Sequence, residues 1–257
     1  MHQRSLLAVL SALLLCLIVT PPKSVRAQSA ATEKPAMYTY VSLWTVPRGN
    51  WSEFESAEAA ALTSLNKLAA DGTVINYGNI IRLNHQEGEP THADWFSSNS
   101  LANLMKALDS LMSGGSARAP VFANTKHWDH IFESRDYATH AGTFTNSYLR
   151  VGVFKYKEGA EHTAEITRAT IGKSLDGMMA DGSAHAYFIQ REAVHTVDPN
   201  SVFIVLFTNG AEGLDKFTAA VADLAKNDPT GLTAFESIIE QKGHFDELWR
   251  VTSGTFK

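Results

Sequence analysis

The chain repeats itself at a fixed spacing. The tripeptide Ala-Asp-Gly at residues 70–72 recurs at residues 180–182, each time after a stretch with helical periodicity and with a Tyr five residues beyond the Gly. The same offset of 110 residues relates further identical positions, among them Leu65 and Leu175, Asn99 and Asn209, and Lys106 and Lys216. Self-similarity at one constant offset indicates internal repetition. The sequence therefore predicts a tandem duplication of a unit of roughly 100 residues.

Both units show the same order of predicted elements. In the first, residues 38–46 alternate like a half-buried strand, and a helix follows with Asn50 as its N-cap and Glu53 as the partner in a capping box. Gly72 ends that helix, because glycine adopts the left-handed conformation without a steric cost. The first unit continues with strands at 73–83, 91–98 and 126–134 and a helix at 100–112. The second unit has strands at 147–156, 184–194, 202–208 and 243–251, and an additional helical segment at 233–241.

A β-α-β-β-α-β unit is the ferredoxin-like motif, which covers only one face of its sheet with helices. The other face needs a partner, and a duplicated chain supplies it internally. This pattern resembles the dimeric α/β-barrel superfamily over nearly all of residues 37–253, in element order, unit length, the Ala-Asp-Gly helix end and the His-x-Asp of each fourth strand. The resemblance implies an α+β fold in which ferredoxin-like units 37–138 and 144–257 pack sheet to sheet as an intrachain barrel around a cavity.

That superfamily includes cofactor-free oxygenases, haem-degrading and haem-binding enzymes, and proteins without an assigned activity. Three functions follow from the resemblance. The first is an exported small-molecule-binding protein that works as a cofactor-free oxygenase or isomerase in the cavity. The second is a haem-binding protein, and the third is a non-catalytic exported module. No motif selects among them, since a fold does not by itself determine a function. We expect no cofactor, with haem as the alternative.

The beginning of the chain has the composition of a cleavable export signal. Residues 6–19 form an apolar run that is too short to span a bilayer comfortably, and Val25 and Ala27 stand where a signal peptidase reads small residues. We therefore expect a signal peptide at 1–27, a flexible segment at 28–36, and a periplasmic or secreted product.

Loss of that leader changes the charge and the cysteine content. It carries three basic residues and no acid, which leaves 19 basic and 27 acidic side chains and a formal charge of −8. An acidic product argues against nucleic acid or an anionic membrane as a partner. The single cysteine, Cys16, leaves with the leader, and no closely spaced His-x-His supports a metal site. The expected partner is a small molecule, and the expected state is a monomer with an internal pseudo-two-fold axis or a homodimer.

The cavity lining depends on the phase of the strands. We assign the bulkier and more polar side chains of the two first strands to the cavity, and these are Tyr40, Trp44, Arg150, Phe154 and Tyr156. The opposite faces carry Val41, Leu43, Val151 and Val153. A strand with the other phase would exchange the two sets.

Candidate catalytic residues lie on the second strand of the second unit, where His185, Tyr187 and Arg191 are in step. A neutral imidazole or a phenol beside an apolar cavity can move a proton. The alternative is a Tyr that packs its ring and satisfies its hydroxyl locally.

Candidate ligand-binding residues complete the expected site. Tyr77 is the counterpart of Tyr187 in the first unit. His127 and His244 each precede an Asp by two residues on a fourth strand, where the Asp shares the same strand face and can hold the imidazole in one tautomer. A pair of surface residues explains this spacing as well.

Overall fold

A computed structural model describes residues 34–114, 119–160, 164–196 and 199–257. The chain from Lys34 onwards forms one compact unit. The expected signal peptide, and residues 28–33 of the expected flexible segment, lie outside the described residues. Of that segment, Lys34 and Pro35 contact Tyr137, whose hydroxyl donates to the Pro35 carbonyl at 3.2 Å.

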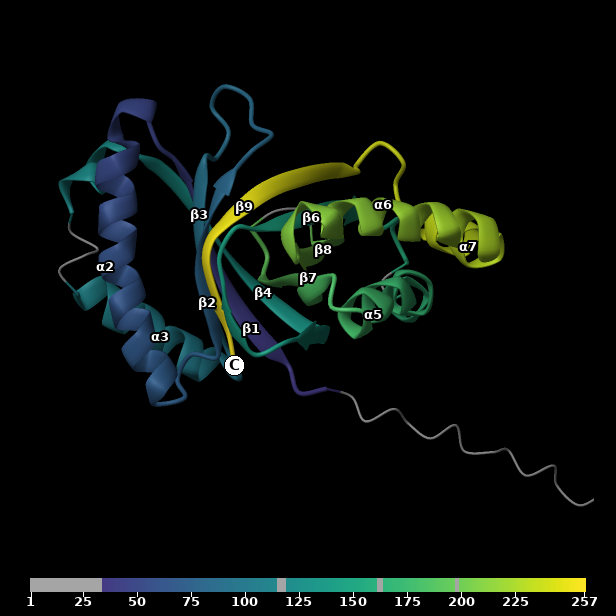
Figure 1. The fold of residues 1–257 in the computed structure, drawn as a ribbon, viewed down its shortest axis with the longest axis horizontal. Helices are drawn as coiled ribbons and strands as arrows, with labels where there is room; N and C mark the ends of the chain where they lie inside the picture. Colours follow the sequence, from purple (N-terminus) through teal and green to yellow (C-terminus); the bar gives the residue numbers. More distant parts are fainter. Residues whose placement is uncertain (1–33, 115–118, 161–163, 197–198) are drawn as a thin grey trace, which may run out of the picture. The chain divides into compact units, whose positions relative to one another are not determined.

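The predicted elements are present in the predicted order (Figure 1). The first half contains β1 (Met37–Thr45), a 3-10 turn (Arg48–Asn50), α2 (Trp51–Ala70), β2 (Asn76–Arg82), β3 (His92–Ser98), α3 (Leu101–Ser113), a second 3-10 turn (Pro120–Asn124) and β4 (Lys126–Thr139). The second half contains β5 (Gly142–Phe144), β6 (Ser147–Lys155), α4 (Ala164–Thr167), a π-helical turn (Arg168–Gly172), α5 (Lys173–Ala180), β7 (Ala184–Val194), β8 (Ser201–Thr208), α6 (Gly210–Asn227), α7 (Pro229–Ile238) and β9 (Phe245–Phe256). The additional helix expected at 233–241 is α7.

The strands form one antiparallel sheet that closes on itself. Its order is β2-β3-β1-β4-β7-β8-β6-β9-β5, and a further pairing of β2 with β9 completes an eight-stranded barrel to which the short β5 is added. Strand order within the first half, β2-β3-β1-β4, equals that within the second, β7-β8-β6-β9. Two seams, β4–β7 and β2–β9, join the halves. The helices lie outside the barrel, α2 and α3 beside the first half and α5 to α7 beside the second (Figure 1). The predicted α+β barrel is confirmed.

The repeated Ala-Asp-Gly has the same structural role in both halves. Gly72 and Gly182 follow their helices with φ of 80° and 76°, a conformation that favours glycine. Asp71 accepts the backbone N–H of Thr73 at 2.9 Å, and Asp181 accepts that of Ser183 at the same distance. A lysine of the second helix of each half then pairs with the same Asp: Lys106 with Asp71 and Lys216 with Asp181.

Two details of the elements differ from the prediction. The capping box is absent, because Asn50 already belongs to the 3-10 turn and its side chain makes no capping bond. Strands β4 and β9 run past the predicted ends at 134 and 251, and their extensions pair across the two seams. Over the part of the chain that the structure describes, no helix has the length and apolar character to cross a membrane.

Candidate functional site: the barrel cavity

The barrel encloses a cavity of about 470 Å³. Small aliphatic side chains of β1 and β6 leave the space: Val41 and Leu43 on one side, Val151 and Val153 on the other. Aromatic side chains supply most of the remaining wall, namely Trp95, Phe132, Phe188, Phe203, Phe207 and Trp249. The volume is that of a small-molecule site, in which apolar walls surround a few polar groups.

Two exposed aromatic rings line the cavity. Trp128 and Phe245 are 40% and 52% exposed, whereas Phe188, Phe207 and Trp249 in the same wall are buried. Trp128 and Phe245 occupy matching positions near the start of β4 and β9, 117 residues apart, each directly after the His of a His-x-Asp sequence. We identify this end as the mouth of the cavity.

His130 brings an imidazole to the cavity wall from β4. Its Nδ1 lies 2.5 Å from a carboxylate oxygen of Glu192 on β7 and 3.0 Å from the hydroxyl of Thr196. Thr196 in turn donates both its hydroxyl and its backbone N–H to Glu192. A carboxylate that accepts Nδ1–H fixes the tautomer, so that Nε2 carries the lone pair. His130 therefore offers Nε2 as a proton acceptor or as a ligand.

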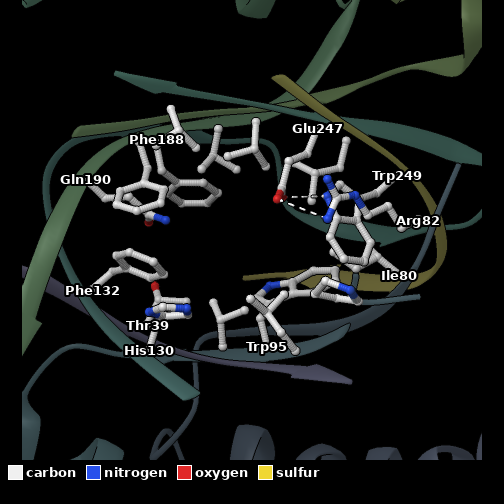
Figure 2. Close-up of a pocket in the computed structure, with 18 of the residues that line it drawn as sticks. Thr39, Ile80, Arg82, Trp95, His130, Phe132, Phe188, Gln190, Glu247 and Trp249 are labelled. Carbon is white, nitrogen blue, oxygen red and sulfur yellow. Dashed lines mark hydrogen bonds and ion pairs between the residues drawn. The ribbon is translucent and has the colours of Figure 1, made fainter. Parts of the chain in front are cut away.

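Arg82 of β2 places a guanidinium at the other seam. It lies 3.4 Å from Glu247 of β9 and 3.6 Å from Glu89, and it stacks 5.6 Å from the ring of Trp249. Trp249 Nε1 donates to Glu247 at 3.0 Å. Burial raises the pKa of Glu247, and Arg82 opposes that shift. Figure 2 shows Arg82 and Glu247 at one side of the cavity and His130 and Gln190 at the opposite side.

The two pairs of polar groups lie at corresponding positions of the two halves of the barrel. Arg82 of β2 matches Glu192 of β7 at the offset of 110, and His130 of β4 matches Glu247 of β9 at the offset of 117. Each seam therefore carries one pair of an acidic and a basic side chain. The basic residue lies on β2 at one seam, whereas the matching position on β7 at the other seam is acidic. One pair holds a permanent cation, and the other holds a histidine.

The strand phase predicted from sequence is wrong. Val41, Leu43, Val151 and Val153 line the cavity, and the side chains expected there face the helices. The reason is one of volume: the layer between sheet and helices needs bulky side chains, and the cavity needs small ones. Tyr40, Trp44, Phe154 and Tyr156 pack in helix-facing clusters, while Arg150 pairs with Asp246 at 2.6 Å and covers Phe217.

Tyr77 and Tyr187 also lie on the helix-facing side. The Tyr77 hydroxyl donates to Asn66 of α2, and the Tyr187 hydroxyl donates to Asp176 of α5 at 2.7 Å. Arg168 donates to the Tyr187 oxygen at 2.9 Å. Burial and this carboxylate raise the pKa of Tyr187. Each phenol is satisfied within its layer, as the alternative reading of the sequence expected.

His185 and Arg191 lie outside the cavity lining too. A register shift between Ala184 and Ala186 turns His185 onto Phe144, with ring centroids 3.6 Å apart, and burial lowers its pKa. Arg191 lies 4.9 Å above the ring of Tyr156.

His127 and His244 share their strand faces with Asp129 and Asp246, as the spacing predicted. The imidazole–carboxylate distances are 3.8 Å and 3.3 Å. Each ring stacks on a helix-facing aromatic, His127 on Trp44 and His244 on Phe154. Neither histidine lines the cavity.

Four polar residues of the cavity wall were not predicted from the sequence: Arg82, His130, Gln190 and Glu247. Glu192, which holds His130, was not predicted either. His127 and His130 are three residues apart on one strand and so lie on opposite faces. His127 stacks on the helix-facing Trp44, and His130 lines the cavity. Among the described residues, no group of three or more His, Cys, Asp or Glu side chains is arranged to hold a metal ion.

Solved structures with a similar fold come from several proteins. A candidate monooxygenase from Fusobacterium nucleatum subsp. nucleatum has a TM-score of 0.63 at 11% identity, over 87% of this chain and 95% of its own. A candidate monooxygenase from Lactobacillus acidophilus NCFM has a TM-score of 0.60 at 11% identity, over 87% and 97%. A candidate chlorite dismutase has a TM-score of 0.52 at 13% identity, over 84% and 94%.

No protein-family model matches the chain, and no curated protein sequence matches it. Identities of 11–13% show a shared fold and nothing finer. Strand order, barrel closure and these likenesses agree. The chain therefore shares its barrel fold with these proteins.

Proposed function

We propose that the chain is an exported small-molecule-binding protein whose ligand site is the barrel cavity. The observation that carries the proposal is an apolar space of about 470 Å³ with one acid–base pair at each seam. Convergent polar groups in an apolar pocket are the usual marks of a ligand site. Export to the periplasm or the exterior rests on the signal-like residues 1–27.

The proposal includes a tandem duplication that leaves one chain with a complete barrel and an internal pseudo-two-fold axis. Contacts that recur at equivalent positions support it. The tyrosine–helix bond recurs as Tyr77–Asn66 and Tyr187–Asp176, and the stacked histidine recurs as His127–Trp44 and His244–Phe154.

The chemistry we propose is removal of a proton from an activated C–H bond. Isomerisation and cofactor-free oxygenation share this first step. The proton moves to His130 Nε2, and the electron pair remains on the substrate as an enolate. An isomerase returns the proton to another carbon of the substrate. In an oxygenase the enolate passes one electron to O₂, the substrate radical and superoxide combine to form a C–O bond, and the resulting peroxide takes the proton from His130. Glu192 keeps His130 in the accepting tautomer and stabilises the imidazolium.

Deuterium exchange tests this step. We expect the mature protein to accelerate exchange of the C1 protons of 2-tetralone in D₂O, followed by NMR, with O₂ uptake measured in parallel. His130→Gln is expected to lower the accelerated rate by about 100-fold, the usual contribution of a general base. His127→Gln is the matched control, because it lies on the same strand but faces the helices. Equal rates in the wild type and His130→Gln would contradict the role of His130 and favour a non-catalytic binding module.

Haem binding is the second candidate, and one observation favours it. A histidine whose Nδ1 is held by a carboxylate leaves Nε2 for a metal, as in haem proteins with a proximal histidine. His130 would hold the iron, and the iron would supply redox chemistry. Titration with haemin separates the candidates: a Soret band that His130→Gln abolishes supports haem, and an unshifted haemin spectrum contradicts it.

A further inference from the structure

We infer that a second ligand site lies outside the barrel, in a cavity beside α6, and that Arg150 binds there the carboxylate of a ligand with an aliphatic chain. This cavity has a volume of about 350 Å³. Its wall comes from α6, from β6 and β9, and from Asn84 between β2 and β3. Helix α6 lies on the outer side of the sheet (Figure 1), so β9 stands between this cavity and the barrel cavity, and Glu247 borders both.

Helix α6 supplies an apolar wall that is only partly covered. Leu214, Phe217 and Val221 are three and four residues apart and therefore share one face of the helix. All residues of α6 are described, and Gly213 alone is buried, while Val221 is 46% exposed. Leu248 of β9 extends the apolar wall. A concave apolar surface of this kind favours a ligand with an apolar part.

The corresponding positions of the first half are packed instead. At the offset of 110 residues, Tyr40 corresponds to Arg150 and Leu108 corresponds to Thr218. Tyr40 and Leu108 pack in the hydrophobic cluster under α3, and the Tyr40 ring lies 5.2 Å from that of Phe96. In the second half an arginine and a threonine line an open space at the same places. The cavity is therefore a feature of the second half and not a general consequence of the fold.

Arg150 has hydrogen-bond donors to spare. Its Nη2 donates to Asp246 at 2.6 Å, and its guanidinium lies 4.4 Å from the ring centroid of Phe217. Among the described residues, the bond to Asp246 is the single hydrogen bond that this side chain donates. A guanidinium carries five N–H donors in a planar fork. The side chain is 28% exposed, so that a ligand can reach it.

The carboxylates of this wall already have basic partners. Asp246 lies 2.6 Å from Arg150 and 3.3 Å from the imidazole of His244. Glu247 lies 3.4 Å from Arg82. The free capacity of the wall is therefore for an acceptor, and the fork of a guanidinium matches both oxygens of a carboxylate. Together with the aliphatic wall, this indicates a carboxylate that carries an aliphatic chain.

Calorimetry at neutral pH with octanoate and octan-1-ol tests the ligand class. The two compounds share a chain length and differ in the charged group. We expect octanoate to bind about tenfold more tightly than octan-1-ol, the effect of hydrogen bonds to a charged group.

Two neighbouring positions of β6 locate the site. Arg150 lines the outer cavity, and Val151, on the opposite face of the strand, lines the barrel cavity. Arg150→Gln is expected to lower the affinity for octanoate by about tenfold or more. Val151→Phe, which fills the barrel cavity, is expected to leave that affinity within about twofold of the wild type.

A second pair of variants lies on the exposed surface of α6, where folding does not depend on the side chain. Val221 lines the cavity, and the exposed Ala222 lies on a different face of the helix. Val221→Glu is expected to weaken octanoate binding about fivefold by repulsion between like charges. Ala222→Glu makes the same change in net charge and is expected to bind octanoate like the wild type.

The site outside the barrel would be overturned by any of three results: no binding of octanoate by the wild type at millimolar concentration, equal affinities for octanoate and octan-1-ol, or unchanged affinity in Arg150→Gln or Val221→Glu. A loss of binding in Val151→Phe would place octanoate in the barrel cavity. It would overturn the outer site and leave the barrel cavity as a ligand site.

Discussion

Replacing Gly78 by alanine is expected to destabilise the protein by about 3 kcal/mol, the upper part of the usual range for overpacking. A Cβ atom at Gly78 would lie 2.2 Å from the backbone oxygen of Ser253 and 2.3 Å from Cη2 of Trp95. Gly78 pairs with Gly254 across the β2–β9 seam, and the Trp95 indole lies close to both positions. A side chain here would have to open the seam that closes the barrel or displace the indole from the cavity wall.

Urea unfolding measures this change. Gly177→Ala is the control, because Gly177 lies inside α5 and a Cβ there meets no atom within 4 Å. Alanine at such a helical position usually stabilises a protein by about 0.5–1 kcal/mol. If Gly78→Ala were as stable as the wild type, the close approach of β2, β9 and Trp95 would be wrong.

Replacing Glu58 by glutamine is expected to raise the free energy of unfolding by roughly 2–4 kcal/mol at pH 9 and to leave it nearly unchanged at pH 5. Glu58 lies on α2, only 7% exposed, and its Oε1 has no partner among the described residues. Burial, followed by repulsion from Asp94, raises its pKa to about 9. Because the folded state holds this proton more tightly than the unfolded chain, stability is lost as pH rises from about 4.5 towards 9.

The comparison needs wild type, Glu58→Gln and Glu53→Gln at both pH values. Glu53 is exposed on the first turn of the same helix, so its variant is expected to follow the wild type. Asp94, whose pKa burial raises to about 7, adds pH dependence to all three proteins. Parallel loss of stability in the wild type and Glu58→Gln between pH 5 and pH 9 would show that Glu58 is not a buried acid.

The element order was predictable from the sequence because local signals agreed with the repeat. Gly72 and Gly182 end helices for a reason that does not depend on the rest of the fold. The helical periodicity of residues 233–241 likewise predicted α7 from local sequence alone. The pairing of strands across the two seams was harder to predict. Strands β4 and β9 continue to Thr139 and Phe256 because each pairs with the other half of the chain, a long-range contact that local periodicity does not contain.

The cavity could not be placed correctly because both faces of these strands are buried. Strand alternation separates two faces, but it does not say which face meets the helices. On β1, Tyr40 and Trp44 fill the layer under the helices, while Val41 and Leu43 leave the cavity open. The register between β1 and β4 then determines which face His130 occupies. His130 lies opposite Val41, and both side chains therefore face the cavity.

Native mass spectrometry of the mature protein, purified without denaturation and incubated with 2-tetralone, tests most directly whether the barrel cavity is a ligand site. Val151→Phe is the comparison, because this position lines the cavity and the larger ring would occupy the space. We expect one 2-tetralone per wild-type chain and none in Val151→Phe. A porphyrin already present in the wild type would favour haem as the occupant of the same cavity. No adduct in the wild type, or the same adduct in both proteins, would contradict a ligand site inside the barrel.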